Sequence, residues 1–172
     1  MRIPPWNPET APRDPALVDA ILERRGGKLI ELDRALLWSE PLARAWNVYL
    51  RAIRQEVSIS PRLREIAICI VAKSTGADYE FKSHWPQYVK AGGNDALRPK
   101  LEDPRAASED AAFAEDERLA MRYALAMTET VRVPDALFGE IRKRFSETEV
   151  VELTAAIATY NMVARFLVAL EI

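Results

Sequence analysis

Residues 61–92, PRLREIAICIVAKSTGADYEFKSHWPQYVKAG, determine the fold of this chain. Ser60 precedes Pro61, and a hydroxyl residue followed by proline in the first turn is typical of a helix start. Nearly every position from 66 to 72 is apolar, so this helix has no wide polar face there. The pattern therefore predicts a helix at the centre of the protein.

A second helix is expected to follow directly. Gly76 ends the first helix, because glycine tolerates the left-handed conformation of a helix C-cap. Asp78 is expected to cap the next helix, which runs to residue 91 and contains His84. Pro86 lies inside it, removes one backbone donor and is expected to kink it. The short turn at Gly76 predicts that the two helices pack antiparallel.

The first fifteen residues contain five prolines, a density that excludes helix and sheet ladders. We therefore expect residues 1–15 to form an extended proline-rich arm, with Trp6 anchoring it to its own domain or to a neighbouring subunit. Residues 16–172 are expected to form a single helical domain. Its first helix should end at Gly26.

Helical periodicity continues through most of the chain. A short segment is expected over 32–38, and Ser39 and Pro41 are expected to start a helix with one apolar stripe. That stripe comprises Leu42, Trp46, Tyr49, Leu50 and Ile53. Residues 94–110 are polar and predict one short helix and a loop, and further helices are expected over 115–131 and from Pro134.

The last helix has the clearest start signal. Ser146 and Glu149 fit the reciprocal capping box, in which each side chain accepts a hydrogen bond from the other residue's amide. From 150 to 170 the sequence is apolar on almost all sides, which is typical of a fully buried helix. In a domain of this size we expect partner subunits to cover part of it, so a homo-oligomer is predicted.

The composition indicates a globular protein. No alternating strand pattern of useful length occurs, so the predicted class is all-α, a helical bundle. The formal net charge of -2 gives no excess of basic residues for nucleic acid or an anionic membrane surface. The opening residues lack an apolar core typical of a secretory signal, and no run of about 18 apolar residues occurs. A cytoplasmic location is therefore expected.

The chain has one cysteine, Cys69, and one histidine, His84. These numbers exclude an intramolecular disulfide, a Cys/His zinc cage and a dithiol redox motif within one chain. We expect no metal and no cofactor. Cys69 lies inside the apolar run of the central helix, which favours a small core residue over a nucleophile.

The order of residues in the central stretch resembles a known family. It comprises Arg64-Glu65, an apolar helix, Thr-Gly-Ala at 75–77, Tyr-Glu-Phe at 79–81, and then His84. This order resembles the carboxymuconolactone decarboxylase family, which includes the alkylhydroperoxidase D proteins. The final helix, with Tyr160 and Arg165, is similar to that of the longer members. The resemblance covers residues 30–170 and implies an alkylhydroperoxidase D-like fold that forms trimers or hexamers.

The resemblance also implies which residues form the site. The peroxidase branch uses a glutamate, a Cys-x-x-Cys pair and a histidine four residues after the second cysteine. The glutamate falls on Glu65 and the histidine on His84, whereas the cysteine positions fall on Ala77 and Glu80. Because a peroxide-reducing cycle needs a nucleophilic thiolate, the resemblance implies the fold and the place of the site but disfavours that reaction.

The expected hairpin brings Glu65 and His84 close together. Glu65 lies about eleven residues and His84 about seven residues from the turn, an axial offset on the order of one helical turn. Side chains, with or without a bridging water, can close that gap. Glu80 precedes His84 by four residues on the same helix face, so both carboxylates can approach the imidazole.

This grouping suits proton transfer. A histidine between carboxylates can act as general acid or base near neutral pH. Decarboxylation of a lactone acid needs a proton delivered to carbon, and the candidate catalytic residues are His84, Glu65 and Glu80. Side chains of suitable charge for a substrate carboxylate are Arg64, Lys82 and Arg165. Tyr160 and Asn161 either line the pocket or bridge helices.

The sequence is compatible with three functions. The first is thiol-independent decarboxylation, or related proton transfer, on a small carboxylated lactone or similar acid. The second is an alkylhydroperoxidase-like antioxidant activity, which would use Cys69. The third is a non-catalytic helical oligomer that binds a small molecule or a protein, in which His84 is a packing residue and Glu65 the partner of a buried cation.

Overall fold

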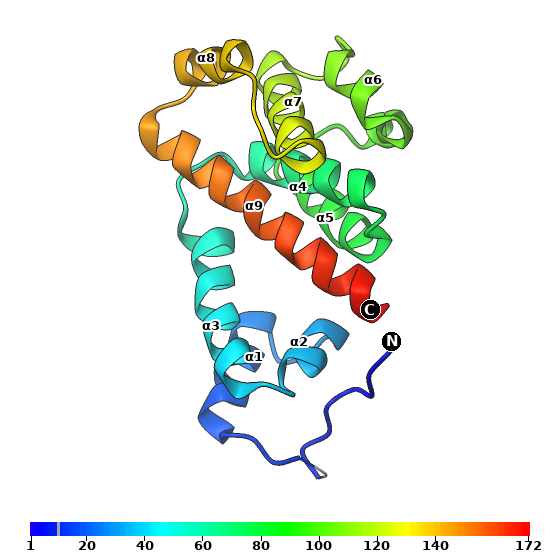
Figure 1. The fold of residues 1–172 in the computed structure, drawn as a ribbon, viewed down its shortest axis with the longest axis vertical. Coiled ribbons are helices and arrows are strands. Elements are labelled where there is room, and N and C mark those ends of the chain that lie inside the picture. Colours follow the sequence, from blue (N-terminus) through cyan, green and yellow to red (C-terminus); the bar gives the residue numbers. More distant parts are fainter. Residues whose placement is uncertain (10) are drawn as a thin grey trace. The chain divides into compact units, whose positions relative to one another are not determined.

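A computed structural model describes residues 1–9 and 11–172; Thr10, in the predicted arm, lies outside the described residues. All regular secondary structure in those residues is helical, which confirms the predicted all-α class (Figure 1). The elements are α1 (Pro15–Arg25), α2 (Glu31–Leu36), α3 (Glu40–Arg51), the π-helix η1 (Ala52–Glu56), α4 (Pro61–Thr75), α5 (Asp78–Lys90), the 3-10 helix η2 (Asp95–Glu102), α6 (Pro104–Glu109), α7 (Glu115–Glu129), α8 (Asp135–Arg144) and α9 (Glu147–Leu170).

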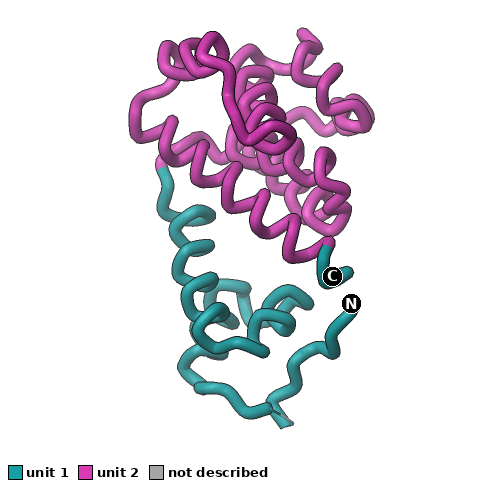
Figure 2. The backbone as a smooth tube through the Cα atoms, viewed as in Figure 1, with its two compact units in different colours: residues 1–57, 169–172 teal, residues 58–168 magenta. Residues whose placement is uncertain are grey.

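The described chain forms two compact units, coloured separately in Figure 2. Unit 1 comprises residues 1–57 and 169–172, and unit 2 comprises residues 58–168. The division predicted from the sequence, an arm over 1–15 and one domain over 16–172, stays a prediction.

Trp6 anchors the N-terminal arm within unit 1, as expected from the sequence. Its side chain is buried, and its indole Nε1 donates to the carbonyl of Ala11 at 2.6 Å. Its backbone is bonded twice to Arg34 of α2: Trp6 N donates to the Arg34 carbonyl, and an Arg34 Nη1 donates to the Trp6 carbonyl. The arm is thus fixed by an apolar side chain together with backbone hydrogen bonds.

Several helix starts differ from the sequence-based expectation. The Ser39 and Ser60 side chains form no capping hydrogen bond within the described structure, although α3 and α4 begin directly after them. Asp78 is the first helical residue of α5, and Ala77 occupies the cap position. In α3 and α4 a proline in the first turn already lacks an amide hydrogen, so one fewer donor needs a cap.

The apolar stripe predicted on α3 is buried only in part. Leu50 and Ile53 are buried, whereas Leu42 is 56% and Tyr49 is 45% exposed. Residues 94–110 also differ, because they form two short helices, η2 and α6, rather than one. The side-chain oxygen of Asn94 caps η2 and that of Asp103 caps α6, so each of these polar residues starts a separate short helix.

Helix α4 is the centre of unit 2, as predicted. Every side chain from Ile66 to Val71 is fully buried, and α4 packs against both α5 and α7 (Figure 1). Gly76 ends α4 with φ of 70°, the left-handed conformation expected of its C-cap. Helix α5 continues through Pro86 to Lys90.

Helix α9 is positioned at its start by two hydrogen-bonded carboxylates. The predicted capping box is confirmed: Ser146 N donates to Glu149 Oε2 at 2.9 Å, and Glu149 N donates to Ser146 Oγ at 3.3 Å. Glu152 Oε2 accepts from Ser58 N, Ser58 Oγ and Ile59 N, which ties the segment before α4 to α9. Burial alone would raise the pKa of Glu152, but these three hydrogen bonds outweigh it and lower that pKa.

By length and composition alone, α9 is the described helix that could cross a membrane, with a mean hydropathy of 1.5 over an 18-residue window. Half of that window is buried inside the protein, which is also typical of a soluble core helix. Val151, Met162 and Val168 are exposed, so α9 is not buried on all sides in the described chain.

Gly93, which follows α5, allows a test of how tightly the ring of Tyr88 is packed. A Cβ atom at position 93 would overlap the ring of the fully buried Tyr88, whereas a Cβ at Gly139 in α8 meets nothing within 4 Å. We expect Gly93→Ala to lower the free energy of unfolding by about 1–3 kcal/mol. Gly139→Ala, as the control, should raise it by about 0.5–1 kcal/mol, because alanine is the better helix former. Urea unfolding measures both, and equal effects of the two variants would contradict the packing described.

Candidate active site

The site forms where α4 and α5 pack against each other within unit 2. The two-residue connection at Gly76 and Ala77 reverses the chain, so the helices are antiparallel and Glu65 lies opposite His84. Their side chains meet directly: Glu65 Oε2 lies 2.6 Å from His84 Nδ1. The sequence predicted an offset of about one turn between them, and the structure shows that side-chain length closes it without a bridging water.

Both partners of this contact are buried. Glu65 is 1% and His84 is 6% exposed. A carboxylate removed from water is costly unless it is paired and hydrogen-bonded, so this contact compensates part of the cost of burying Glu65. At 2.6 Å the contact is a short hydrogen bond.

Arg64 binds the other oxygen of the same carboxylate. Its Nη2 and Nε lie 3.2 Å and 3.4 Å from Glu65 Oε1, and Arg64 is only 7% exposed. The sequence suggested Arg64 as a substrate-binding residue, which stays a prediction. In the structure its guanidinium is directed at Glu65.

Tyr160 of α9 completes the surroundings of the imidazole. The rings of His84 and Tyr160 are 4.7 Å apart between centroids and inclined by 79°, an edge-to-face arrangement. Such pairs prefer this geometry because of the ring quadrupoles. Three helices, α4, α5 and α9, therefore determine the orientation of His84.

Cys69 and Glu80 each lie one helical turn from a member of the Glu65–His84 pair. Glu80 is buried and precedes His84 by four residues on α5, while Cys69 is fully buried and follows Glu65 by four residues on α4. Burial raises the pKa of the Cys69 thiol well above its ordinary value, and the negative charges of Glu65 and Glu80 raise it further. A thiol in such surroundings is a poor nucleophile.

The remaining predicted residues are placed differently. Lys82 is exposed and only two residues from His84, a spacing that points side chains to different faces of a helix. Asn161 is buried and donates to Thr128 Oγ1 of α7 at 2.9 Å, and Arg165 donates to the carbonyl and Oδ1 of Asn161. Asn161 thus bridges α9 and α7, one of the two roles considered for it. The structure groups Arg64, Glu65, His84 and Tyr160 by direct contact.

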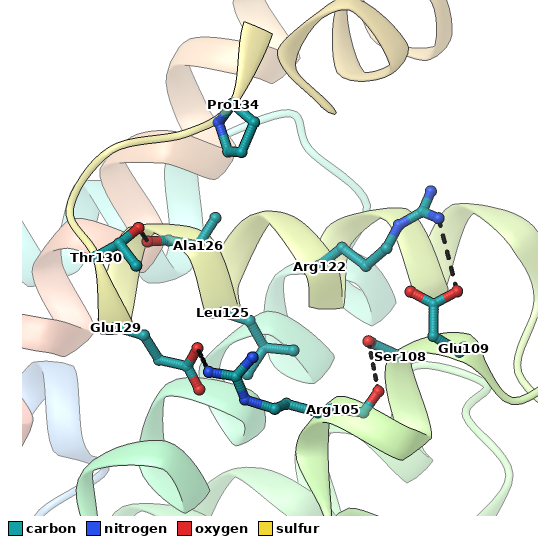
Figure 3. Close-up of a pocket in the computed structure, with 9 residues that line it drawn as sticks. All are labelled: Arg105, Ser108, Glu109, Arg122, Leu125, Ala126, Glu129, Thr130 and Pro134. Atoms are coloured by element: carbon teal, nitrogen blue, oxygen red, sulfur yellow. Dashed lines mark hydrogen bonds and ion pairs between the residues drawn. The ribbon is translucent and has the colours of Figure 1, made fainter. Parts of the chain in front are cut away.

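A separate cleft in unit 2, which no motif in the sequence indicated, has a volume of about 390 Å³ (Figure 3). It lies between α6, α7 and the segment before α8. Its lining residues are Arg105, Ser108, Glu109, Arg122, Leu125, Ala126, Glu129, Thr130 and Pro134. The charged side chains at its rim pair with acids: Arg105 with Glu129, and Arg122 with Glu109 and Glu140.

No group of three or more His, Cys, Asp or Glu side chains in residues 1–9 and 11–172 is arranged to hold a metal ion. The side chains grouped around His84 can exchange a proton. An imidazole oriented by a carboxylate at one nitrogen can transfer a proton through the other.

The sequence matches no protein-family model and no curated protein. Solved structures share the fold, among them the following two. One is an uncharacterized peroxidase-related protein from Silicibacter sp. TM1040, with a TM-score of 0.74 and 18% identity over 100% of this chain and 87% of that one. The other is a cysteine-to-alanine variant of the debrominase Bmp8 in complex with 2,3,4-tribromopyrrole, with a TM-score of 0.76 and 20% identity over 99% of this chain and 90% of that one. The fold is therefore alkylhydroperoxidase D-like, as the sequence resemblance implied.

The burial of Cys69 predicts a thiol that is almost inert in the native protein. We expect alkylation of native Cys69 to be at least about 100-fold slower than that of a cysteine introduced by Ser83→Cys on the exposed face of α5, because local opening must precede reaction. Mass spectrometry of Cys69 and of the added thiol in the same sample measures both rates. Equal rates, or oxidation of native Cys69 by dilute peroxide, would contradict the burial and favour a thiol-dependent activity.

Proposed function

We propose that this protein is a cofactor-free enzyme of proton transfer to carbon, and that it decarboxylates a small carboxylated lactone or related acid. The observation that supports this proposal is the buried Glu65–His84 hydrogen bond, with Nδ1 of the imidazole 2.6 Å from the carboxylate. In this proposal, Nε2 of His84 is the nitrogen that meets the substrate. The resemblance in the central hairpin suggests the substrate class.

The proposed reaction needs no external oxidant or reductant. The bond between the substrate carboxylate and the ring carbon breaks, and its electron pair moves into the conjugated carbonyl of the lactone as carbon dioxide leaves. His84 then delivers a proton from Nε2 to the carbon that carries the developing negative charge. Glu65 stabilises the protonated imidazole through Nδ1, and solvent returns the proton to His84. General acid–base catalysis of this kind contributes roughly 10²- to 10⁴-fold to a rate.

The surroundings of His84 suggest roles for the other residues. Tyr160 packs against the imidazole, so it is the candidate best placed to contact a bound substrate. Glu80 is buried one turn from His84 and contributes negative charge to the same region. Binding of the substrate carboxylate by Lys82 or Arg165 remains part of the proposal. So do assembly into a trimer or hexamer and a cytoplasmic location.

The alternative antioxidant function has less support. It requires a reactive thiolate, and Cys69 is fully buried with a raised pKa. A non-catalytic binding role remains the second alternative, and it predicts that ligand binding survives the loss of His84.

The proposal is tested by carbon dioxide release from a panel of carboxylated lactones. We expect His84→Ala to reduce kcat by roughly 10²- to 10⁴-fold, because the proton donor is lost. The matched control is Ser83→Ala, which changes the adjacent, exposed residue of α5 and should leave kcat unchanged. Equal release by wild type and His84→Ala would contradict the site, and release by no form of the protein would contradict the substrate class.

A further inference from the structure

Arg64 and Glu65 form an unusual pair for a helix. Neighbouring residues point about 100° apart around the axis, and paired charges on helices normally lie three or four residues apart. In α4 the Arg64 side chain nevertheless folds onto the adjacent carboxylate, with Nη2 and Nε at 3.2 Å and 3.4 Å from Oε1. Both residues are more than nine-tenths buried, so the contact is not a solvent-exposed surface pair.

The two oxygens of Glu65 therefore have different partners. Oε1 accepts from the Arg64 guanidinium, and Oε2 faces His84 Nδ1. A carboxyl group on a glutamate turns easily about its last torsion angle. A planar guanidinium that binds one oxygen through two nitrogens opposes that rotation and directs the other oxygen at the imidazole.

We infer that Arg64 is a positioning residue which, through Glu65, fixes His84 in the tautomer that carries its hydrogen on Nδ1. A carboxylate accepts hydrogen bonds and does not donate, so the Nδ1 that faces Oε2 is the donor. In the neutral ring, Nε2 then carries the lone pair, and in the protonated ring it carries the transferable hydrogen. The edge-to-face contact with Tyr160 restricts the plane of the ring at the same time.

This assignment gives the Arg64 charge a role that differs from substrate binding. The catalytic role of Nε2 rests on the proposed function. The tautomer of His84, in contrast, is a property of the resting protein. Without Arg64, the Glu65 carboxylate can rotate, and the imidazole can shift its hydrogen to Nε2. Part of the molecules would then carry the hydrogen of the neutral ring on Nε2, so that solvent could not return a proton to that nitrogen.

The tautomer is directly measurable, because His84 is the only histidine in the chain. Two-dimensional ¹H–¹⁵N spectra that correlate ring nitrogens with ring carbon-bound hydrogens distinguish a protonated from an unprotonated nitrogen. All imidazole signals of the uniformly ¹⁵N-labelled protein belong to this one residue. At a pH where the ring is neutral, we expect wild type to show hydrogen on Nδ1; hydrogen on Nε2 would overturn the inference without any variant.

Variants test the role of Arg64. We expect Arg64→Met to lose the Nδ1–H pattern in a large share of molecules and Arg64→Lys, which keeps a charge near Oε1, to retain most of it. The matched control is Arg62→Met, which removes the same charge from α4 where it pairs with Asp116 and Glu117. It should keep the wild-type pattern. Amide spectra establish that each variant is folded, and a folded Arg64→Met variant with the wild-type ring pattern would overturn the inference.

Kinetics separate this inference from the proposed function. If Arg64 positions His84, Arg64→Met lowers kcat with little change in KM, and Arg64→Lys restores part of kcat. A raised KM at unchanged kcat would instead make Arg64 a substrate-binding residue and overturn the inference. If no substrate turns over but the tautomer depends on Arg64, the positioning role stands while the decarboxylase proposal fails.

Discussion

The hydrogen bond between Glu65 and His84 is the interaction on which the rest of this site depends. It joins two antiparallel helices across their buried interface and places a carboxylate where only 1% of the residue is exposed. Burial of a charge at that depth is tolerated only when its oxygens are bonded, and here His84 and Arg64 each bind one of them. The reversal of the chain at Gly76 is what brings the two helices into this register.

On the side of the imidazole away from Glu65, packing within the fold restricts the orientation of the ring. Helix α9 contributes Tyr160, and α9 is itself fixed to the segment before α4 by Glu152 and to α7 by the hydrogen bond between Tyr123 and Thr154. One turn beyond His84, Tyr88 is fully buried and donates to Glu117 of α7. The orientation of one side chain is thus determined by packing within unit 2, which supports a role in chemistry more than a role in surface binding.

Much of this arrangement was predictable from the sequence. The apolar run from 66 to 72, the stop at Gly76 and the capping box at Ser146 are local patterns with local causes, and the structure confirmed each of them. The approach of Glu65 to His84 followed from counting residues back from a tight turn. The sequence-based expectation was incomplete where side-chain direction or tertiary contacts decide: it gave no sign that Arg64 folds onto its neighbour, and Leu42 and Tyr49 of the predicted apolar stripe are exposed.

The most direct measurement is a double-mutant cycle across this contact, with Glu65→Ala, His84→Ala and the double variant unfolded by urea at neutral pH, because alanine can form no side-chain hydrogen bond. A hydrogen bond that involves a charged group predicts a coupling free energy of about 1.5–3 kcal/mol between the two positions. Effects that add to within about 0.5 kcal/mol would show that Glu65 and His84 do not interact, and would contradict the site and the function proposed from it.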